Sequence, residues 1–476
     1  MDIFRSYRPL PDAPWDRAAA AHLARRAGFG AYGAALDHLV QLGPEAAVAH
    51  FVDAPVETPD LDAEIAAIGS ALDVHAGGPG AYGRESTDRL RRWWIYRMVR
   101  TPTPLVEKLA LLWHDHFAVQ EGIVIRTALL LEQNQTFRRL ALAPYQDLLR
   151  AVARDPAMLV FLDNRLSSKE SPNENWAREL VELFTLGVDQ YSQTDVRELS
   201  RIFTGWTTPA AHIAEFRFEP TMHDDGDKQL FGARIAGRTG ARGIAEGEEA
   251  LALILAQPAH AEFLARKLLE WFGHREPALD TVEAFAQVLR KNGGSIRESL
   301  RVLFSSAWFF APEQRHAIYK NPVELVVGAA RGAEVGNPHL ANLEHHAVAL
   351  GMELFEPPSV AGWEHGSAWV RTGSVAPRLN FALAVAELPH AARTVTGRAT
   401  VNLDELAAQA GEGPRNLAAA LAERFLQQNL EPDQEAALVE YLDAARANAP
   451  DERTGRREGV RAALHLLLAA PQFTLA

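Results

Sequence analysis

Glu179 is the acidic side chain whose place in the sequence is hardest to reconcile with a solvated surface. At about 100° per residue, a helix over residues 171–187 puts Glu179 within its apolar arc. That arc consists of Trp176, Leu180, Leu183, Phe184 and Leu186. A lone buried carboxylate is costly unless it is protonated, paired or bound to a metal ion. We therefore interpret Glu179 as a catalytic or metal-binding group, with a buried salt bridge to an arginine such as Arg138 or Arg266 as the alternative.

The ends of this helix are predicted from its capping residues. Ser171 and Glu174 have the spacing of a capping box, and Pro172 lies at the first helical position, where its missing N–H costs nothing. Gly187 suits a left-handed C-terminal cap. Glu174 and Glu182 face away from the apolar arc, and surface ion pairing is the favoured interpretation for both.

Two histidines lie close together in the segment Trp113-His-Asp-His-Phe117. On a helix, His114 and His116 point about 160° apart, so they cannot both bind one metal ion. His116 shares the apolar face of its helix and is the better candidate for a site. A core histidine that bonds a backbone carbonyl is the alternative for His116.

The loop over residues 219–228 contains one histidine and three aspartates. It lacks the twelve-residue pattern of a calcium loop with its closing glutamate. His223 and Asp224 could instead complete a mixed nitrogen and oxygen site for a divalent ion with His116 and Glu179. The alternative is a solvated acidic turn whose charge is balanced by a nearby lysine.

These residues favour a hydrolase with an inward-facing His/Glu/Asp centre. Its catalytic set is Glu179, Asp224, His116 and His223, and the same four residues form the predicted metal set. Two mechanisms fit: one divalent ion that activates water, or two carboxylates that share acid and base work, as in glycoside hydrolysis. A saccharide or another small molecule is the expected substrate. The alternative is a non-catalytic helical binding or assembly protein whose buried polar network fixes the helix register.

Further polar and aromatic side chains near these segments form the predicted substrate-binding set. A carboxamide on an apolar helix face needs partners, and indole rings can stack on sugar rings. The set consists of Asn134, Asn173, Glu174, Asn175, Trp113, Trp206 and Trp363.

Several classes of chemistry are excluded by what the sequence lacks. The chain has no cysteine, which removes disulfides, thiolate catalysis and Fe–S clusters. It has no Gly-x-Ser-x-Gly elbow, no Walker A motif and no Gly-x-Gly-x-x-Gly turn between a strand and a helix. Nucleotide, flavin and haem cofactors are therefore not expected, and one divalent metal ion is the single cofactor considered.

Composition bounds the partners and the compartment. The 476 residues are 47% hydrophobic, which is enough for a large core, and the formal net charge of −13 argues against nucleic acid as a partner. No run reaches the roughly 18 apolar residues of a membrane span. The first residues lack a secretory pattern, so the sequence as it stands predicts a cytoplasmic protein, whereas a removed leader would indicate a periplasmic or exported one. The oligomeric state is not predicted.

Helical periodicity runs through most of the chain, which predicts the all-α class: a large multi-helix body with two long irregular loops over 206–245 and 351–378. A short β-hairpin is expected in the first loop, around Phe216 to Phe231. We predict one helical domain over 1–385 that carries the site, and a C-terminal helical extension over 386–476 packed on it. Helices are predicted over 15–55, 60–72, 87–118, 126–153, 171–187, 194–205, 246–273, 278–291, 295–308, 321–334, 338–350, most of 402–448, and 457–470.

Several blocks of the sequence resemble, in a fixed order, the bacterial family named "domain of unknown function 1800". The resemblance covers roughly residues 18 to 385 and implies the helical fold, but no particular reaction. Many members of the family are exported, and the start of this sequence departs from that. The blocks are His22–Gly30, Trp113–Phe117, Asn134–Arg138, Asp155–Leu159, Asn173–Gly187, Phe203–Trp206, His223–Asp224, Ala265–Leu268, Lys320–Glu324 and Pro358–Trp363.

Overall fold

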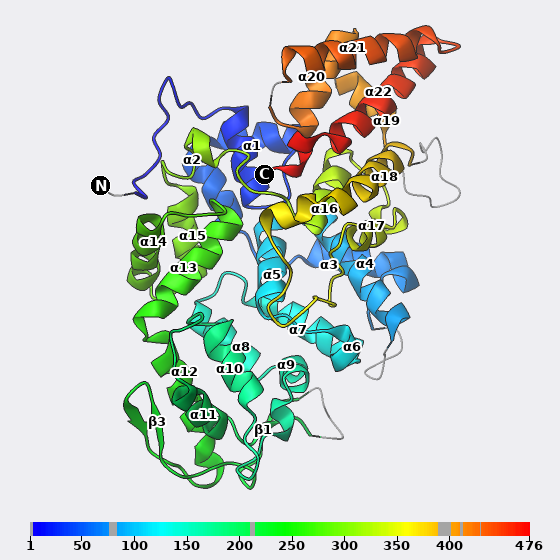
Figure 1. Ribbon diagram of the computed structural model, residues 1–476. Helices are drawn as coiled ribbons and strands as arrows, with labels where there is room; N and C mark the ends of the chain where they lie inside the picture. Colours follow the sequence, from blue (N-terminus) through cyan, green and yellow to red (C-terminus); the bar gives the residue numbers. More distant parts are fainter. Residues whose placement is uncertain (1–2, 76–82, 210–214, 389–400, 410–412, 429) are drawn as a thin grey trace.

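The computed structural model of the protein describes residues 3–75, 83–209, 215–388, 401–409, 413–428 and 430–476. Helices make up most of these residues, and two short antiparallel strand pairs are the sheet structure among them. The predicted all-α class is therefore confirmed (Figure 1). Within the described ranges, no helix is both long enough and apolar enough to cross a membrane.

In the N-terminal half, glycines and prolines divide the long predicted helices. The helix expected over 87–118 is two helices, because Pro104 begins a new one, and the helix expected over 126–153 is interrupted before Pro144. Gly33 precedes the second helix of the segment 15–55. The helices here are α1 (Arg17–Arg26), α2 (Ala34–Val52), α3 (Pro59–Ile68), α4 (Arg84–Arg100), α5 (Pro104–His116), α6 (Glu121–Val124), α7 (Thr127–Arg139), α8 (Tyr145–Ala153) and α9 (Pro156–Phe161).

The middle of the chain contains six helices and the strands of the first irregular loop. β1 (Trp206–Thr207) pairs with β2 (Arg217–Phe218), and β3 (Lys228–Leu230) pairs with β4 (Ala233–Ile235). The expected short hairpin is thus present as two separate ladders. The helices are α10 (Glu174–Glu182), α11 (Gln193–Ile202), α12 (Ile244–Leu255), α13 (Pro258–Phe272), α14 (Leu279–Lys291) and α15 (Ile296–Phe304).

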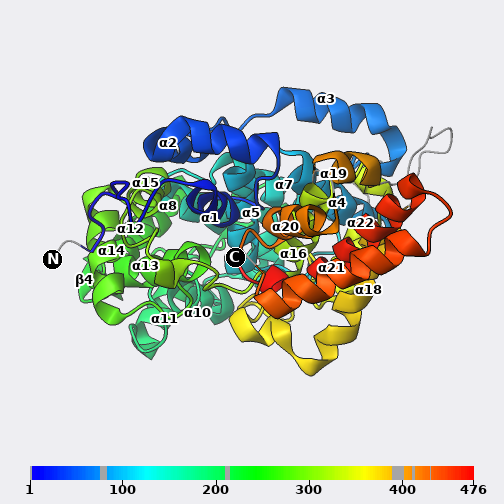
Figure 2. The same cartoon turned by 90° about the horizontal axis from the view of Figure 1, so that it is seen from above.

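The C-terminal helices pack on one another and on the body of the protein. α22 lies against α18 and α21, and α20 contacts α16 (Figure 2). The end of the chain returns to the body, where the Ala476 N–H donates to the Ile318 carbonyl at 2.8 Å. The predicted boundary at 385 falls at the end of α18 and stays a prediction. The helices are α16 (Pro322–Gly332), α17 (Leu343–Ala349), α18 (Val375–Ala386), α19 (Leu403–Gln409), α20 (Pro414–Phe425), α21 (Pro432–Ala447) and α22 (Glu452–Ala469).

Helix α5 lies in the middle of the molecule, and every one of its residues is buried (Figure 1). Its charged groups are therefore paired inside the protein. Glu107 accepts hydrogen bonds from Arg138 Nε at 2.8 Å, Arg97 Nε at 3.2 Å and Trp94 Nε1 at 3.0 Å. Burial would raise the pKa of Glu107, but the two guanidinium groups and the indole hold it at about 2. The surrounding helices are thereby tied to α5 through one carboxylate.

Four histidines are buried in this core: His22, His114, His116 and His260. Burial disfavours the charged ring and lowers the pKa of His114 to about 3 and that of His260 to about 4. The pKa values of His22 and His116 are also lowered, first by burial and then by nearby cationic groups. All four rings are neutral in the folded protein near pH 7.

We expect the free energy of unfolding to fall as the pH decreases from about 6.5 toward 4. The unfolded chain binds protons on these histidines in that range and the folded chain does not, so acid favours unfolding by roughly 1 kcal/mol per histidine for each pH unit. Asp155 opposes this with one proton, because burial raises its pKa to about 7. Urea unfolding followed by circular dichroism at pH 7 and pH 5.5 measures the difference. Equal or greater stability at pH 5.5 would contradict the assignment of neutral buried rings.

Candidate functional site

Asp115, near the end of α5, is a buried acid that is held next to a histidine at a cavity. Its side chain is only 1% exposed, and its Oδ1 accepts a hydrogen bond from the Trp363 N–H at 2.9 Å. Its Oδ2 lies 3.1 Å from Nε2 of His365, whose side chain is 46% exposed. A buried carboxylate with a fixed position is thus in contact with an imidazole that is partly exposed to solvent.

The segment over residues 359–366 can approach Asp115 this closely because residue 362 is a glycine. Gly362 has a φ of +83°, and a Cβ there would lie 2.4 Å from the Asp115 carbonyl oxygen and 2.5 Å from its Oδ1. Any larger residue would push the segment away from the carboxylate. The second irregular loop is therefore shaped around the end of α5.

The environment of Asp115 keeps its carboxyl ionised. Burial alone would raise its pKa, but the close contact and charge of His365, the charge of Lys267 and the Trp363 N–H together bring the pKa below its ordinary value. An ionised acid at this position orients the imidazole and stabilises its protonated form.

His365 borders a cavity of about 340 Å³ that is formed by α13, the start of α16 and the second irregular loop. This volume is within the range of small-molecule sites. The cavity is lined by Lys267, Glu270, Trp271, Arg275, Glu276, Ile318, Tyr319, Asn321, Glu324, His365, Gly366 and Trp369.

Helix α13 supplies three of these side chains from one face. Lys267, Glu270 and Trp271 are spaced i, i+3 and i+4, so they lie side by side along the helix. The Trp271 ring meets the His365 ring edge-on, with centroids 5.8 Å apart. Glu270 is exposed, and the partial desolvation by its neighbours raises its pKa, although the charges of Lys267, Arg266, His365 and Arg275 oppose this. A carboxyl with a raised pKa is suited to donate a proton.

The start of α16 closes another side of the cavity. Asn321 accepts the Glu324 N–H through Oδ1 at 2.9 Å, and Glu324 accepts the Asn321 N–H at 3.1 Å, which is a complete capping box. Glu324 is also paired with the buried Lys108 of α5 at 2.8 Å. This wall is fixed by its own contacts, and the Asn321 amide group lies at its surface.

Glu179 does not lie at this cavity. Its side chain is half-buried and has no hydrogen-bond or ion-pair partner within the described ranges. Burial and the neighbouring Glu182 raise its pKa, and Arg178 lowers it. Glu179 is thus partly buried, as predicted, but it lacks the close partners that were expected. The reason is that α10 ends at Glu182, so residues 183–186 do not extend the apolar face of the helix around Glu179.

His116 lies in the core and does not line the cavity. Its Nε2 lies 2.8 Å from the Tyr145 hydroxyl and 3.3 Å from the Phe184 carbonyl oxygen. This matches the core alternative for His116. His114 is equally buried, and its Nε2 accepts the Phe355 N–H at 3.0 Å.

His223 and Asp224 hold the first irregular loop in place. His223 Nε2 lies 3.3 Å from Oε1 of Glu246, whose other oxygen binds the fully buried Lys228. Asp224 accepts two hydrogen bonds from Arg201, at 2.8 and 3.2 Å. These ion pairs close the loop, and Lys228, which the alternative of an acidic turn named as the balancing charge, contacts Asp224 and Glu246.

The four residues of the predicted metal set are not brought together. His116 and His223 have separate sets of neighbours, and Asp224 is paired with Arg201. In the described part of the chain, no group of three or more His, Asp or Glu side chains has the arrangement of a metal site. Three of the four donors, His116, His223 and Asp224, are held in structural contacts.

Most of the predicted substrate-binding residues also have structural contacts. Asn134 accepts a hydrogen bond from Arg138 at 2.8 Å beside the Glu107 cluster. Trp113 is fully buried and donates to the Ala141 carbonyl oxygen at 3.2 Å, and Trp206 is fully buried against Phe203.

The predicted residues at the start of α10 form its cap. Asn173 accepts the Asn175 N–H at 2.7 Å, so it is the N-cap, and the predicted cap at Ser171 was wrong by two residues. Glu174 pairs with Arg178 at 3.3 Å, as surface ion pairing predicted. Asn175 is exposed.

Trp363 alone of the predicted set touches the new site, through its backbone bond to Asp115. The sequence reasoning missed Asp115, His365, Lys267 and Glu270. The family resemblance could have pointed to this site. Four of its blocks each contribute a residue that lines the cavity or contacts the Asp115–His365 pair. These blocks lie around residues 113–117, 265–268, 320–324 and 358–363.

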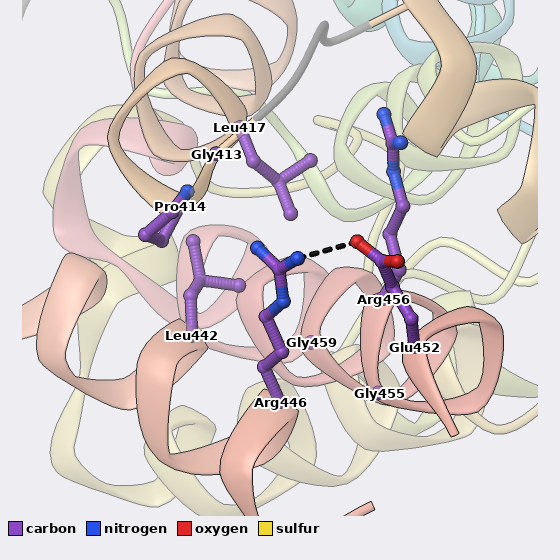
Figure 3. Close-up of a pocket in the computed structure, with 9 residues that line it drawn as sticks. All are labelled: Gly413, Pro414, Leu417, Leu442, Arg446, Glu452, Gly455, Arg456 and Gly459. Atoms are coloured by element: carbon purple, nitrogen blue, oxygen red, sulfur yellow. Dashed lines mark hydrogen bonds and ion pairs between the residues drawn. The ribbon is translucent and has the colours of Figure 1, made fainter.

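A second cavity, of about 400 Å³, lies among the C-terminal helices α20, α21 and α22 (Figure 3). An ion pair between Arg446 and Glu452 crosses it, and Arg456 donates to the Ala407 carbonyl. Its lining contains no histidine, and its single acid, Glu452, is paired with Arg446, so it lacks a free pair of groups for acid–base chemistry.

Replacing Gly362 by alanine should displace Asp115 and destabilise the protein. The positive φ and the close approach to Asp115 together predict a loss of at least about 2 kcal/mol in the free energy of unfolding. Gly373→Ala is the matched control, because no atom lies within 4 Å of a Cβ at that position in the same segment. Urea unfolding of both variants checks this. If Gly362→Ala costs no more than Gly373→Ala, the packing of this segment against α5 is not as described.

Comparison with known proteins is consistent with this arrangement of blocks. No curated protein and no solved structure matches the chain. A family model described as "Protein of unknown function (DUF1800)" matches residues 22–475. The match extends beyond residue 385 and includes the C-terminal helices, so the resemblance is wider than the sequence blocks indicated. The chain belongs to the DUF1800 family.

Proposed function

We propose that the protein is a hydrolase whose general acid–base centre is the Asp115–His365 pair. The observation that carries the proposal is the 3.1 Å contact between a buried carboxylate and an imidazole that borders a cavity of about 340 Å³. An acid that orients a histidine at a cavity is a recurring arrangement for activating water or a hydroxyl group.

The roles of the two residues follow from their contacts. Asp115 is held through its Oδ1, which accepts the Trp363 N–H. Its Oδ2 faces Nε2 of His365, and a carboxylate oxygen there favours the tautomer that carries the proton on Nε2. The Nδ1 atom is then left as the base. When the ring takes a proton from water, the carboxylate stabilises the resulting imidazolium.

Glu270 is the proposed proton donor to the leaving group. It lines the same cavity as His365, and its pKa is raised by desolvation. A carboxyl group and an imidazole that line one cavity can serve as the acid and the base of a hydrolysis. Because the original set around Glu179 is not assembled, this pair takes the place of the paired carboxylates expected from the sequence.

A saccharide is the proposed substrate class. Trp271 and Trp369 supply aromatic surface, and Tyr319 and Asn321 supply polar groups in the same cavity. A site that mixes aromatic faces with hydrogen-bonding groups suits a molecule with both apolar ring faces and hydroxyl groups.

The alternative is a non-catalytic helical binding or assembly protein. It is supported by the buried cluster in which Glu107 joins Arg97, Arg138 and Trp94 of neighbouring helices. Such a network fixes the helix register without any reaction. The hydrolase requires His365 for turnover, whereas the non-catalytic protein would need it only for folding.

We expect His365→Asn and Asp115→Asn to reduce turnover by about 10²–10⁴-fold, because the first removes the base and the second leaves it in the wrong ring form. The assay is the release of reducing ends from a panel of neutral and acidic oligosaccharides. Thermal unfolding of each variant verifies that it is folded.

Glu179→Gln is the matched control, since this acid lies on α10 away from the cavity. It should change turnover by less than about twofold. Full activity of His365→Asn, or a loss caused by Glu179→Gln instead, would overturn the proposal. Absence of hydrolysis across the panel would favour the non-catalytic alternative.

A further inference from the structure

The cavity beside His365 contains two cationic side chains without an ion pair. Lys267 and Arg275 both line it, and neither has a carboxylate within 4 Å in the described part of the chain. This contrasts with Lys108, which is buried nearby and is paired with Glu324 at 2.8 Å. Unpaired cations at the wall of a cavity leave their charge available to a ligand.

Arg275 is held in a defined position. It donates to the Ser367 hydroxyl at 3.1 Å, and its guanidinium lies against Gly366, where an added Cβ would come within 2.2 Å of Cζ. Gly366 has a φ of +66°, so the chain is shaped to admit the guanidinium. The remaining N–H groups of the planar fork have no partner within the described residues and suit a carboxylate.

None of the acids that line the cavity forms an ion pair with Lys267 or Arg275 in the described part of the chain. These acids are Glu270, Glu276 and Glu324, and Glu324 is paired with Lys108 instead. Lys267 and Arg275 therefore remain unpaired at the wall of the cavity.

A third cavity, of about 640 Å³, adjoins the cavity beside His365, because Trp369 lines both. Trp363 lines this third cavity, and Trp271 lines the cavity beside His365. Two adjoining cavities with an indole between them provide room for more than one sugar unit.

We propose that the substrate is an acidic oligosaccharide, and that Lys267 and Arg275 bind the carboxylate of one of its uronic acid units. This inference rests on the proposed function, since it concerns the same cavity. A charge-assisted hydrogen bond to a carboxylate contributes enough to make the acidic sugar bind at least tenfold more tightly than its neutral counterpart.

Isothermal titration calorimetry with the full chain tests this. The probes are the trimers of galacturonate, mannuronate and guluronate, with the methyl-esterified galacturonate trimer, maltotriose and cellotriose as neutral counterparts. At least one acidic trimer should bind, at least tenfold more tightly than the neutral sugars, and its affinity should fall as sodium chloride is raised.

Arg275→Gln and Lys267→Met should each weaken that binding by at least tenfold. Arg242→Gln is the control, because it removes the same charge from an exposed position that does not line either cavity, and it should change affinity by less than about twofold. Binding of none of the acidic trimers, equal binding of neutral sugars, or an equal effect of Arg242→Gln would overturn the inference.

The result separates this inference from the proposed function. Acidic trimers that bind but are not cleaved support the inference and count against hydrolysis. Neutral sugars that are cleaved while no acidic trimer binds support hydrolysis and overturn the inference.

Discussion

Because α5 passes through the middle of the protein, the carboxylate of Asp115 near its end is removed from water and must be compensated there. The compensation comes from a segment almost 250 residues later in the sequence, which supplies the Trp363 N–H and the His365 ring. An unpaired carboxylate in this position would cost several kcal/mol. The course of the second irregular loop, the absence of a side chain at residue 362 and the position of His365 at a cavity all follow from this one buried charge.

Other buried charges in the protein are compensated more completely. Glu107 is joined to two arginines, Lys108 to Glu324, and Lys228 to Glu246. Breaking any of these pairs would leave an uncompensated charge, so they fix the arrangement of helices. The cavity beside His365 is different, because its cations and Glu270 are near one another without direct pairing. Charges held apart around an open space have the arrangement of a binding site rather than of a structural network.

The periodicity of the sequence predicted the helices well where glycine and proline did not intervene. The segments 278–291 and 321–334 correspond closely to α14 and α16. The segment 171–187 shows the limit of the method. α10 covers only Glu174–Glu182, so the side chains at 183, 184 and 186 are not on its face and Glu179 lies at the edge of the buried surface.

The site itself could not be predicted from helical geometry. His114 and His116 were correctly expected to point to opposite sides of α5, but the residue between them carries the contact to the cavity. Its partner lies in a loop without periodicity, and no local pattern places that loop at the end of α5. The pairing of His223 and Lys228 with Glu246 was also missed, since Glu246 lies 18 residues beyond Lys228 and no local pattern relates it to the loop.

The most direct test of the Asp115–His365 pair is the ¹⁵N NMR spectrum of the His365 ring in the wild-type protein and in Asp115→Asn. The wild-type neutral ring should carry its proton on Nε2, because that atom faces the carboxylate. In Asp115→Asn the amide oxygen should keep the Trp363 N–H, so the amide NH₂ would face the ring and move the proton to Nδ1. The same proton position in both proteins, or a wild-type ring protonated on Nδ1, would contradict this account.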